Sequence, residues 1–433
     1  MNQRDQQILR IALPSIVSNI TVPLLGMIDV AIVGHMGDAA FIGAVAVGSM
    51  IFNLVYWLFG FLRMSTSGMT AQAYGGRRLD DVIRILVRST VVALAVALTL
   101  MVLQEPLRLL MFWLMGPTDD VVAFAVTYFR IVIWGAPAMM GLYCLSGWFI
   151  GMQNTRIPMF ISIMQNIVNI LASLMLVYGF GMKIEGVALG TVIAQYAGLL
   201  AAVVLLARHY GRLFRHFPVI RDSWNLRHHG HFFQTNRDLF LRTVCLVGVN
   251  LFFTSASARQ GAVVLSVNTV MLQLFLFFSY FMDGFAYAGE ALGGRFFGAG
   301  NATAFHDTLR RLFRWALFVT AAFTLLYIIG SMQIVCLLTD EPQVRDTARE
   351  FIWWVWLVPA AGAAAFIWDG VFVGITASRG MLVATFVATL SFGAVYLLTK
   401  DTLGNHGLWL AQVVYLAMRG LLQTVWINKN KKI

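Results

Sequence analysis

Long apolar stretches constrain this chain more than any other feature of its sequence. Twelve follow one another at about residues 10–34, 41–68, 82–103, 121–143, 157–180, 186–207, 240–258, 262–290, 312–336, 346–368, 380–399 and 405–427. Most approach the roughly 20 residues that an α-helix needs to cross a bilayer. Hydrophobic residues make up 59% of the chain and charged residues 12%, against about 45–50% and about 25% in soluble domains. We therefore predict an all-α polytopic membrane protein with twelve transmembrane helices, and not a soluble enzyme.

The longest polar segment, residues 208–238, divides the twelve stretches into six and six. This predicts an N-terminal six-helix bundle over residues 1–207, a basic cytoplasmic linker over 208–238 and a C-terminal bundle over 239–433. Arginines and neighbouring histidines in the linker also suggest a nucleic-acid or metal patch, with His228 and His229 at its centre. We favour a solvated linker that sets topology, with neither a metal nor a nucleic-acid partner.

The basic residues explain the net charge of +11. With the N-terminus inside, 22 of the 31 Lys and Arg fall on the inner face and 6 on the outer face. Only Arg63, Arg130 and Arg419 remain within or at the ends of spans. The positive-inside rule then predicts a multi-pass protein of the inner membrane with both termini cytoplasmic.

The two halves repeat one another. Gly147-Trp-Phe-Ile-Gly151 recurs as Gly370-Val-Phe-Val-Gly374, and Ala71-Gln-Ala-Tyr-Gly75 recurs as Gly294-Arg-Phe-Phe-Gly298, both 223 residues later. Each half holds six spans, so the repeat is parallel, with its pseudo-axis along the membrane normal. Substrate sites of such transporters lie near the midplane, and rocking of the two bundles gives alternating access.

Asp29 is the main candidate for ion coupling. It lies in an apolar span with no Lys or Arg within a helical turn or two, where a charge costs roughly 2.5–3.5 kcal/mol on insertion scales. Burial favours the neutral carboxyl, which can then take up and release a proton; a structural, hydrogen-bonded Asp is the alternative. Asn166, Asn169, Ser173 and Thr191 are polar candidates of the same half, either for coupling or as interhelical hydrogen bonds that stabilise the bundle.

Three acids of the second half are further candidates. Asp369 follows an aromatic-rich apolar run, and a functional role is predicted for it. Asp283 and Glu290 lie seven residues apart, on one face of a span. Glu290 has the alternative of pairing with Arg295, and Asp283 that of pairing with a basic residue of its half such as Arg242.

Other chemistry is disfavoured. The three cysteines lack metal-ligand spacing, and no nucleotide-binding, HExxH, CxxC or GxSxG motif is present. The sequence therefore predicts neither an enzyme nor a cofactor. Pro14, which precedes Asp29 in the first span, is a candidate hinge because proline in a helix interior permits a kink; a static bend is the alternative.

The whole chain resembles the multidrug and toxic compound extrusion (MATE) transporters, and within them the DinF-like branch. The resemblance depends on the order of Leu13-Pro14-Ser15-Ile16, Ile28-Asp-Val-Ala-Ile-Val-Gly34, Ala-Gln-Ala-Tyr-Gly75, Gly-Met-Gln-Asn154-Thr-Arg-Ile-Pro158, Asn166-Ile-Val-Asn169, Glu185-Gly-Val-Ala-Leu and Trp368-Asp-Gly-Val-Phe-Val-Gly374. It implies two six-helix lobes forming a V and efflux of organic, often cationic or amphipathic, compounds in exchange for H⁺ or Na⁺. We expect a monomer in the lipid bilayer.

The resemblance also implies roles for single residues. Asp29 matches the coupling carboxylate of the family's first lobe, and Pro14 matches a proline at which some members are proposed to bend. Asn169 and Thr191 match polar members of the same network, whereas Ser173 stands where several relatives have a second Asp.

The choice of coupling ion also follows from the resemblance. Asp369 resembles an acid that some members carry on span 10, and the Glu that Na⁺-coupled relatives of another branch carry on span 7 is missing. The sequence therefore predicts a secondary, H⁺-coupled drug exporter. Na⁺-coupled antiport and a lipid-linked oligosaccharide flippase are the alternatives; the flippases often add spans and carry several cationic residues in the cleft.

Overall fold

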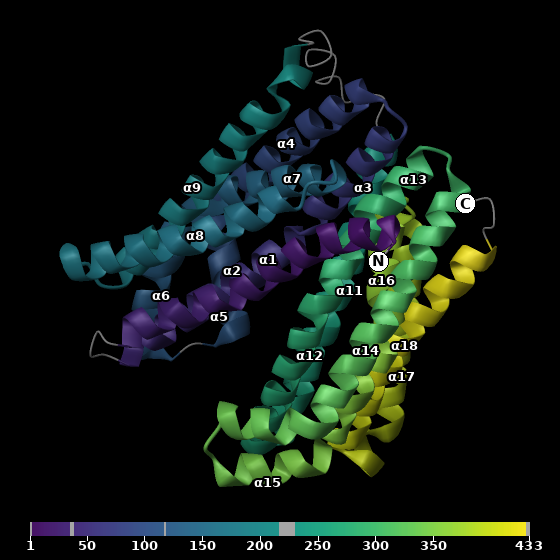
Figure 1. Cartoon of the computed structure of the whole chain (residues 1–433). Helices are drawn as coiled ribbons and strands as arrows, with labels where there is room; N and C mark the ends of the chain where they lie inside the picture. Colours follow the sequence, from purple (N-terminus) through teal and green to yellow (C-terminus); the bar gives the residue numbers. More distant parts are fainter. Residues whose placement is uncertain (1, 35–38, 117, 216–229, 430–433) are drawn as a thin grey trace. The chain divides into compact units, whose positions relative to one another are not determined.

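The computed structural model describes residues 2–34, 39–116, 118–215 and 230–429, and all regular elements in these ranges are helical (Figure 1). The helices of the first half are α1 (Gln3–Gly34), α2 (Ala39–Phe59), α3 (Phe61–Gly75), α4 (Leu79–Val102), α5 (Gln104–Met115), α6 (Asp119–Val132), α7 (Ala136–Gly151), α8 (Arg156–Leu174) and α9 (Ile184–Tyr210). Those of the second half are α11 (Gly230–Arg259), α12 (Ala262–Ala288), α13 (Gly294–Gly298), α14 (Ala302–Leu338), α15 (Pro342–Phe351), α16 (Trp353–Gly374), α17 (Ser378–Leu403) and α18 (Asn405–Lys429). The short turns η1 (Ile133–Gly135), η2 (Met175–Gly179), η3 (Gly211–Arg215) and η5 (Gly289–Gly293) connect or extend them.

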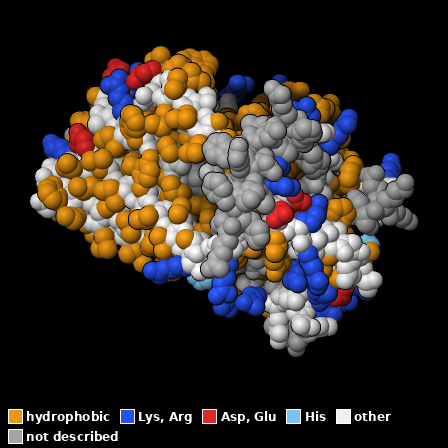
Figure 2. All heavy atoms as spheres, turned by 90° about the horizontal axis from the view of Figure 1, so that it is seen from above, with side chains coloured by type: hydrophobic (Ala, Val, Ile, Leu, Met, Phe, Trp, Pro, Cys, Tyr) orange, Lys and Arg blue, Asp and Glu red, His pale blue; other side chains and the backbone are white. Residues whose placement is uncertain are grey.

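These helices account for the predicted crossings. Eleven helical segments of the described residues are long and apolar enough to span a bilayer, and α1 covers the remaining predicted stretch, 10–34. Large apolar side chains such as Leu98, Leu171, Leu317 and Leu398 are exposed on the spans. Figure 2 shows apolar side chains over much of the visible face, as contact with lipid requires.

The predicted repeat appears in the backbone. Helices α14, α15 and α17 begin 222 or 223 residues after α4, α6 and α8, and α16 ends 223 residues after α7. Close helix packing repeats as well. A Cβ atom on Gly147 would lie 2.3 Å from the carbonyl oxygen of Arg63, and one on Gly370 would lie 2.0 Å from that of Ala286. These glycines let two helix backbones touch, which explains the repeated motif found in the sequence.

Contacts divide the chain into two compact units. The first lobe is Val17–Gly230, and the second lobe is Met1–Ile16 together with His231–Ile433. This division differs from the expected bundle 1–207 because the start of α1 packs on helices of the second half. The predicted linker 208–238 is helical at both ends, in η3 and in α11, while His228 and His229 lie outside the described residues.

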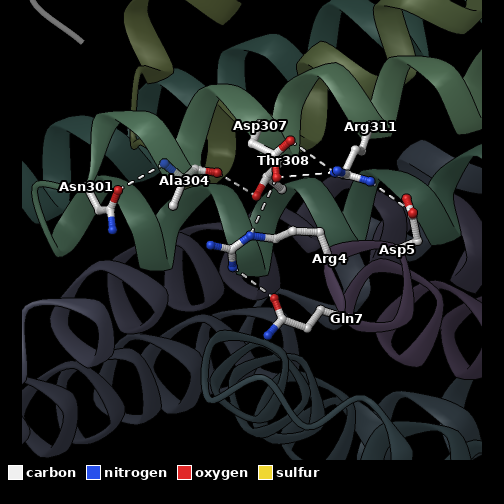
Figure 3. A network of polar contacts seen from close by, with 8 residues as sticks. All are labelled: Arg4, Asp5, Gln7, Asn301, Ala304, Asp307, Thr308 and Arg311. Atoms are coloured by element: carbon white, nitrogen blue, oxygen red, sulfur yellow. Dashed lines mark hydrogen bonds and ion pairs between the residues drawn. The ribbon is translucent and has the colours of Figure 1, made fainter. Parts of the chain in front are cut away.

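Charged side chains attach the start of α1 to α14 within the second lobe (Figure 3). Arg311 Nη1 donates to Asp5 Oδ2 at 3.0 Å, and its Nε donates to Asp307 Oδ1 at 3.0 Å. Arg4 Nε lies 3.8 Å from Asp307 Oδ2, and Trp315 Nε1 donates to Asp5 Oδ1 at 3.3 Å. The first helix therefore begins in one lobe and ends, with Asp29, in the other.

Candidate functional site

Asp29 is a buried carboxylate of the first lobe. Its residue is 4% exposed, and its Oδ1 atom has no hydrogen-bond partner among the described residues. No Lys or Arg of the described ranges forms an ion pair with it. Such a group is costly when ionised, since neither a countercharge nor a full set of hydrogen bonds replaces its water.

Tyr128 on α6 connects Asp29 with two other helices. It is 2% exposed and lies within electrostatic range of Asp29. Its hydroxyl is 3.4 Å from Ser49 Oγ on α2 and also interacts with the Thr191 side chain on α9. Gly48 permits this position, because a Cβ there would lie 2.3 Å from the tyrosine ring. The hydroxyl can thus pass a change at Asp29 to α2 and α9.

Asn169 and Ser173 on α8 continue this polar region. Asn169 is fully buried, and its Nδ2 donates to Thr191 Oγ1 at 3.2 Å. Thr191 Oγ1 in turn donates to the carbonyl of Val187 at 3.0 Å. Asn169 Oδ1 and Ser173 Oγ have no hydrogen-bond partner among the described residues. Two acceptor atoms therefore remain available in the part of the lobe that holds Thr191.

Asn166 has a different position from the one predicted. Its Nδ2 donates to the carbonyl of Thr21 on α1 at 2.8 Å, and Thr21 lies about 12 Å before Asp29 by helix rise. Thr21 Oγ1 also lies 3.0 Å from Ser162 Oγ. Asn166 therefore holds α1 against α8 rather than joining the Tyr128 group.

Pro14 lies inside α1, which is helical without interruption from Gln3 to Gly34. The boundary between the lobes falls two residues further on, between Ile16 and Val17. A bend near Pro14 would thus separate the anchored start of α1 from the part that carries Asp29. Its role as a hinge stays a prediction.

Asp369, on α16, has partners that the sequence did not reveal. Its Oδ2 accepts hydrogen bonds from Arg242 on α11 and Arg419 on α18, and its Oδ1 accepts one from Gln423 Nε2 at 2.7 Å. Arg242 and Arg419 are only 4% and 6% exposed. A carboxylate shared by two guanidinium groups remains charged. The structure thus favours a charge-balancing role for Asp369 over the predicted proton-carrying one.

The other second-half acids lie outside these printed bonds. Arg242, offered by the sequence as a partner for Asp283, pairs with Asp369 instead and belongs to a membrane span rather than to the inner-face loops. Asp283 is half-buried on α12, within electrostatic range of Arg419. Glu290 is buried in η5 at 2% exposure. Coupling roles for both acids, and a Glu290–Arg295 pair, stay predictions.

Comparison with known proteins identifies the family. The MatE family model matches residues 14–175 and 239–398, which is more than half of the chain. The chain belongs to the MATE family. "DNA damage-inducible protein F" of Escherichia coli (strain K12) is 35% identical over 98% of this chain and 93% of its own length. This relative confirms the predicted DinF-like branch.

More distant MATE proteins show the same fold. "Protein DETOXIFICATION 44, chloroplastic" of Arabidopsis thaliana is 25% identical over 97% of this chain and 81% of its own. A solved structure described as the outward-facing conformation of a multidrug resistance MATE family transporter aligns with a TM-score of 0.86 at 17% identity, over 99% of this chain and 96% of that chain. The predicted twelve-helix fold is confirmed, and this MATE protein is an efflux transporter rather than an enzyme.

Sequence reasoning missed Tyr128, Ser49 and Arg242. Tyr128 lies in an apolar run, where aromatic residues were assigned to the core or to lipid. Arg242 continues the arginine-rich linker in sequence and was counted as topology. No signal in the sequence alone joins Arg242 with Asp369, because they lie 127 residues apart. In the described residues, no group of three or more His, Cys, Asp or Glu side chains is arranged to hold a metal.

Proposed function

We propose that this MATE protein exports organic, often cationic or amphipathic, compounds in exchange for protons, and that Asp29 carries the proton. One observation supports this most: Asp29 is buried without a cationic partner, and its Oδ1 lacks a hydrogen bond among the described residues. Such a carboxylate changes its interactions strongly between the charged and the neutral form, which a coupling group requires.

The geometry suggests how protonation acts on the first lobe. An ionised Asp29 only accepts hydrogen bonds, whereas a protonated one also donates. Tyr128 senses this difference through its position near Asp29 and conveys it to Thr191 and thereby to Asn169. The two protonation states thus favour two arrangements of α1 and its neighbours, with Pro14 as the hinge.

Exchange follows when a substrate and a proton favour different arrangements. Protonation of Asp29 from outside favours the arrangement that releases the substrate, and loss of the proton inside restores the binding form. The strength of this coupling equals the difference in substrate affinity between the two forms. The protein acts as a monomer of the inner membrane, with both termini in the cytoplasm.

Everted vesicles test the proposal. Vesicles with the wild-type protein and a pH probe should release protons when ethidium is added, while Asp29→Asn should reduce this release at least about tenfold, the usual minimum effect of removing a proton-transfer group. Asp120→Asn is the matched control, because Asp120 is an exposed acid of the same lobe.

Two results contradict the proposal. Ethidium-driven proton release that persists in Asp29→Asn shows that another group carries the proton. Efflux driven at fixed pH by an imposed Na⁺ gradient alone shows that Na⁺, the main alternative, is the coupling ion.

A further inference from the structure

One face of α18 carries four buried polar side chains, here called the α18 stripe: Gln412, Tyr415, Arg419 and Gln423. Their spacing of three or four residues places them on one side of the helix. None is more than 6% exposed, although α18 is one of the membrane-spanning helices. The stripe is therefore a continuous polar face inside the second lobe.

Each member of the α18 stripe has one polar atom without a hydrogen-bond partner among the described residues. These atoms are Gln412 Oε1, Tyr415 Oη, Arg419 Nε and Gln423 Oε1. Buried polar atoms in proteins are nearly always satisfied, and each exception costs about 1–3 kcal/mol. Four exceptions on one helix face indicate a place where a polar ligand supplies the missing partners.

The charges define which ligand fits. Arg419 and Arg242 share the single carboxylate of Asp369, so these three groups carry one net positive charge. Asp283 on α12 is the further acid that acts on Arg419, as the last and smallest of the listed influences on that group. A guanidinium has five N–H donors, and the one from Arg419 to Asp369 leaves Nε directed elsewhere. Spare cationic donors match an oxyanion, and guanidinium geometry matches a carboxylate.

Aromatic rings adjoin these donors. The guanidinium carbon of Arg419 lies 5.4 Å from the centre of the Tyr415 ring. The Phe392 ring meets Tyr415 edge to face at 6.2 Å. A flat apolar body beside a carboxylate would thus find an aromatic surface next to the guanidinium.

We infer that the α18 stripe, with Arg242 and Asp369, binds the carboxylate of an aromatic organic acid in the second lobe. Arg419 is the main donor, and the Tyr415 hydroxyl is a second one. Asp369 is the resident counter-ion that holds both guanidinium groups and competes with the ligand for them. The inference deepens the proposed function and rests on it for the statement that the ligand is transported, whereas binding needs no proton gradient.

Calorimetric titration of the full-length protein in nanodiscs, without a pH gradient, tests the site with 1-naphthoate and its uncharged amide, 1-naphthamide. Wild type should bind the acid at least about tenfold more tightly than the amide, since one charge-assisted hydrogen bond contributes that much. Arg419→Gln should remove roughly this tenfold preference. Asp369→Asn should instead increase affinity for 1-naphthoate, because it removes the competing carboxylate.

Tyr415→Phe keeps the test decisive where Asp369→Asn does not fold. It removes only a hydroxyl and should weaken 1-naphthoate binding by about three- to tenfold, the usual contribution of a neutral hydrogen bond. Arg130→Gln, in the first lobe, is the control and should leave affinity unchanged. A purely structural ion cluster would lower thermal stability in the variants without these opposite changes in affinity.

Three results would overturn the site: equal affinity for the acid and the amide, unchanged 1-naphthoate binding in Arg419→Gln, or binding of inorganic phosphate or phosphatidylglycerol in place of 1-naphthoate. The last result would assign the stripe to phosphate groups. Asp29→Asn separates the two proposals. It should keep 1-naphthoate affinity, and intact proton release in that variant would reject Asp29 as the proton carrier while leaving the site in the second lobe.

Discussion

In the first lobe a single carboxylate, Asp29, is buried without a cationic partner, whereas in the second lobe Asp369 is buried between Arg242 and Arg419. The helices that hold the two sites repeat at almost constant spacing. The charges do not: Ser146 occupies the position before Gly147 that Asp369 occupies before Gly370. A repeated backbone thus carries two electrostatic environments, one suited to a group that changes charge and one suited to permanent charges.

The largest expected effect is in the second lobe. Asp369→Asn leaves two buried guanidinium groups without their shared countercharge and should lower the free energy of unfolding by about 3–5 kcal/mol, the usual cost of breaking a buried ion pair. Thermal unfolding in detergent measures it. Asp340→Asn is the control, because Asp340 pairs with Arg345 at 2.7 Å on the surface, where a pair contributes about 0–1 kcal/mol. Equal small losses would remove the contrast between the lobes.

A smaller and equal effect is expected where the lobes agree. Gly147→Ala and Gly370→Ala each place a Cβ within 2.3 Å of a backbone carbonyl oxygen and should each destabilise by about 1–3 kcal/mol through overpacking. Gly393→Ala, whose Cβ meets nothing within 4 Å, should be neutral or slightly stabilising. Strongly unequal losses at the two equivalent glycines would show that the lobes do not share this packing.

The smallest effect on stability is expected at Asp29. Asparagine keeps the shape of the side chain and removes the option of a buried charge, so Asp29→Asn should change the free energy of unfolding by less than about 1 kcal/mol and with a stabilising sign. The same thermal measurement applies, with Asp120→Asn as the reference. A loss as large as that of Asp369→Asn would indicate that Asp29 has an ionic partner.

Sequence reasoning reached the fold because hydropathy and repeat spacing are local or periodic properties of the chain. Twelve apolar stretches specify twelve helices, and the glycines at 147 and 370 mark the repeat. The same reasoning could single out Asp29, since an isolated acid in an apolar run is visible without any partner.

It could not find what depends on distant side chains. Arg242 looked like one more linker arginine until the fold placed it beside Asp369. Tyr128 looked like core filling because a hydroxyl changes hydropathy little, and its position near Asp29 arises only from packing against Gly48. The start of α1 was assigned to the first bundle because its Asp5 contact with Arg311 is not visible in local sequence.

That contact has a consequence for biosynthesis. Asp5 and Arg311 lie 306 residues apart, and at roughly 5–20 residues per second the ribosome needs about 15–60 s to make the chain between them. The first helix is therefore among the first to enter the membrane, yet the binding surface for its beginning does not exist until α14 is made. Membrane insertion of the first lobe must proceed with this helix end undocked, and completion of the second lobe then fixes it.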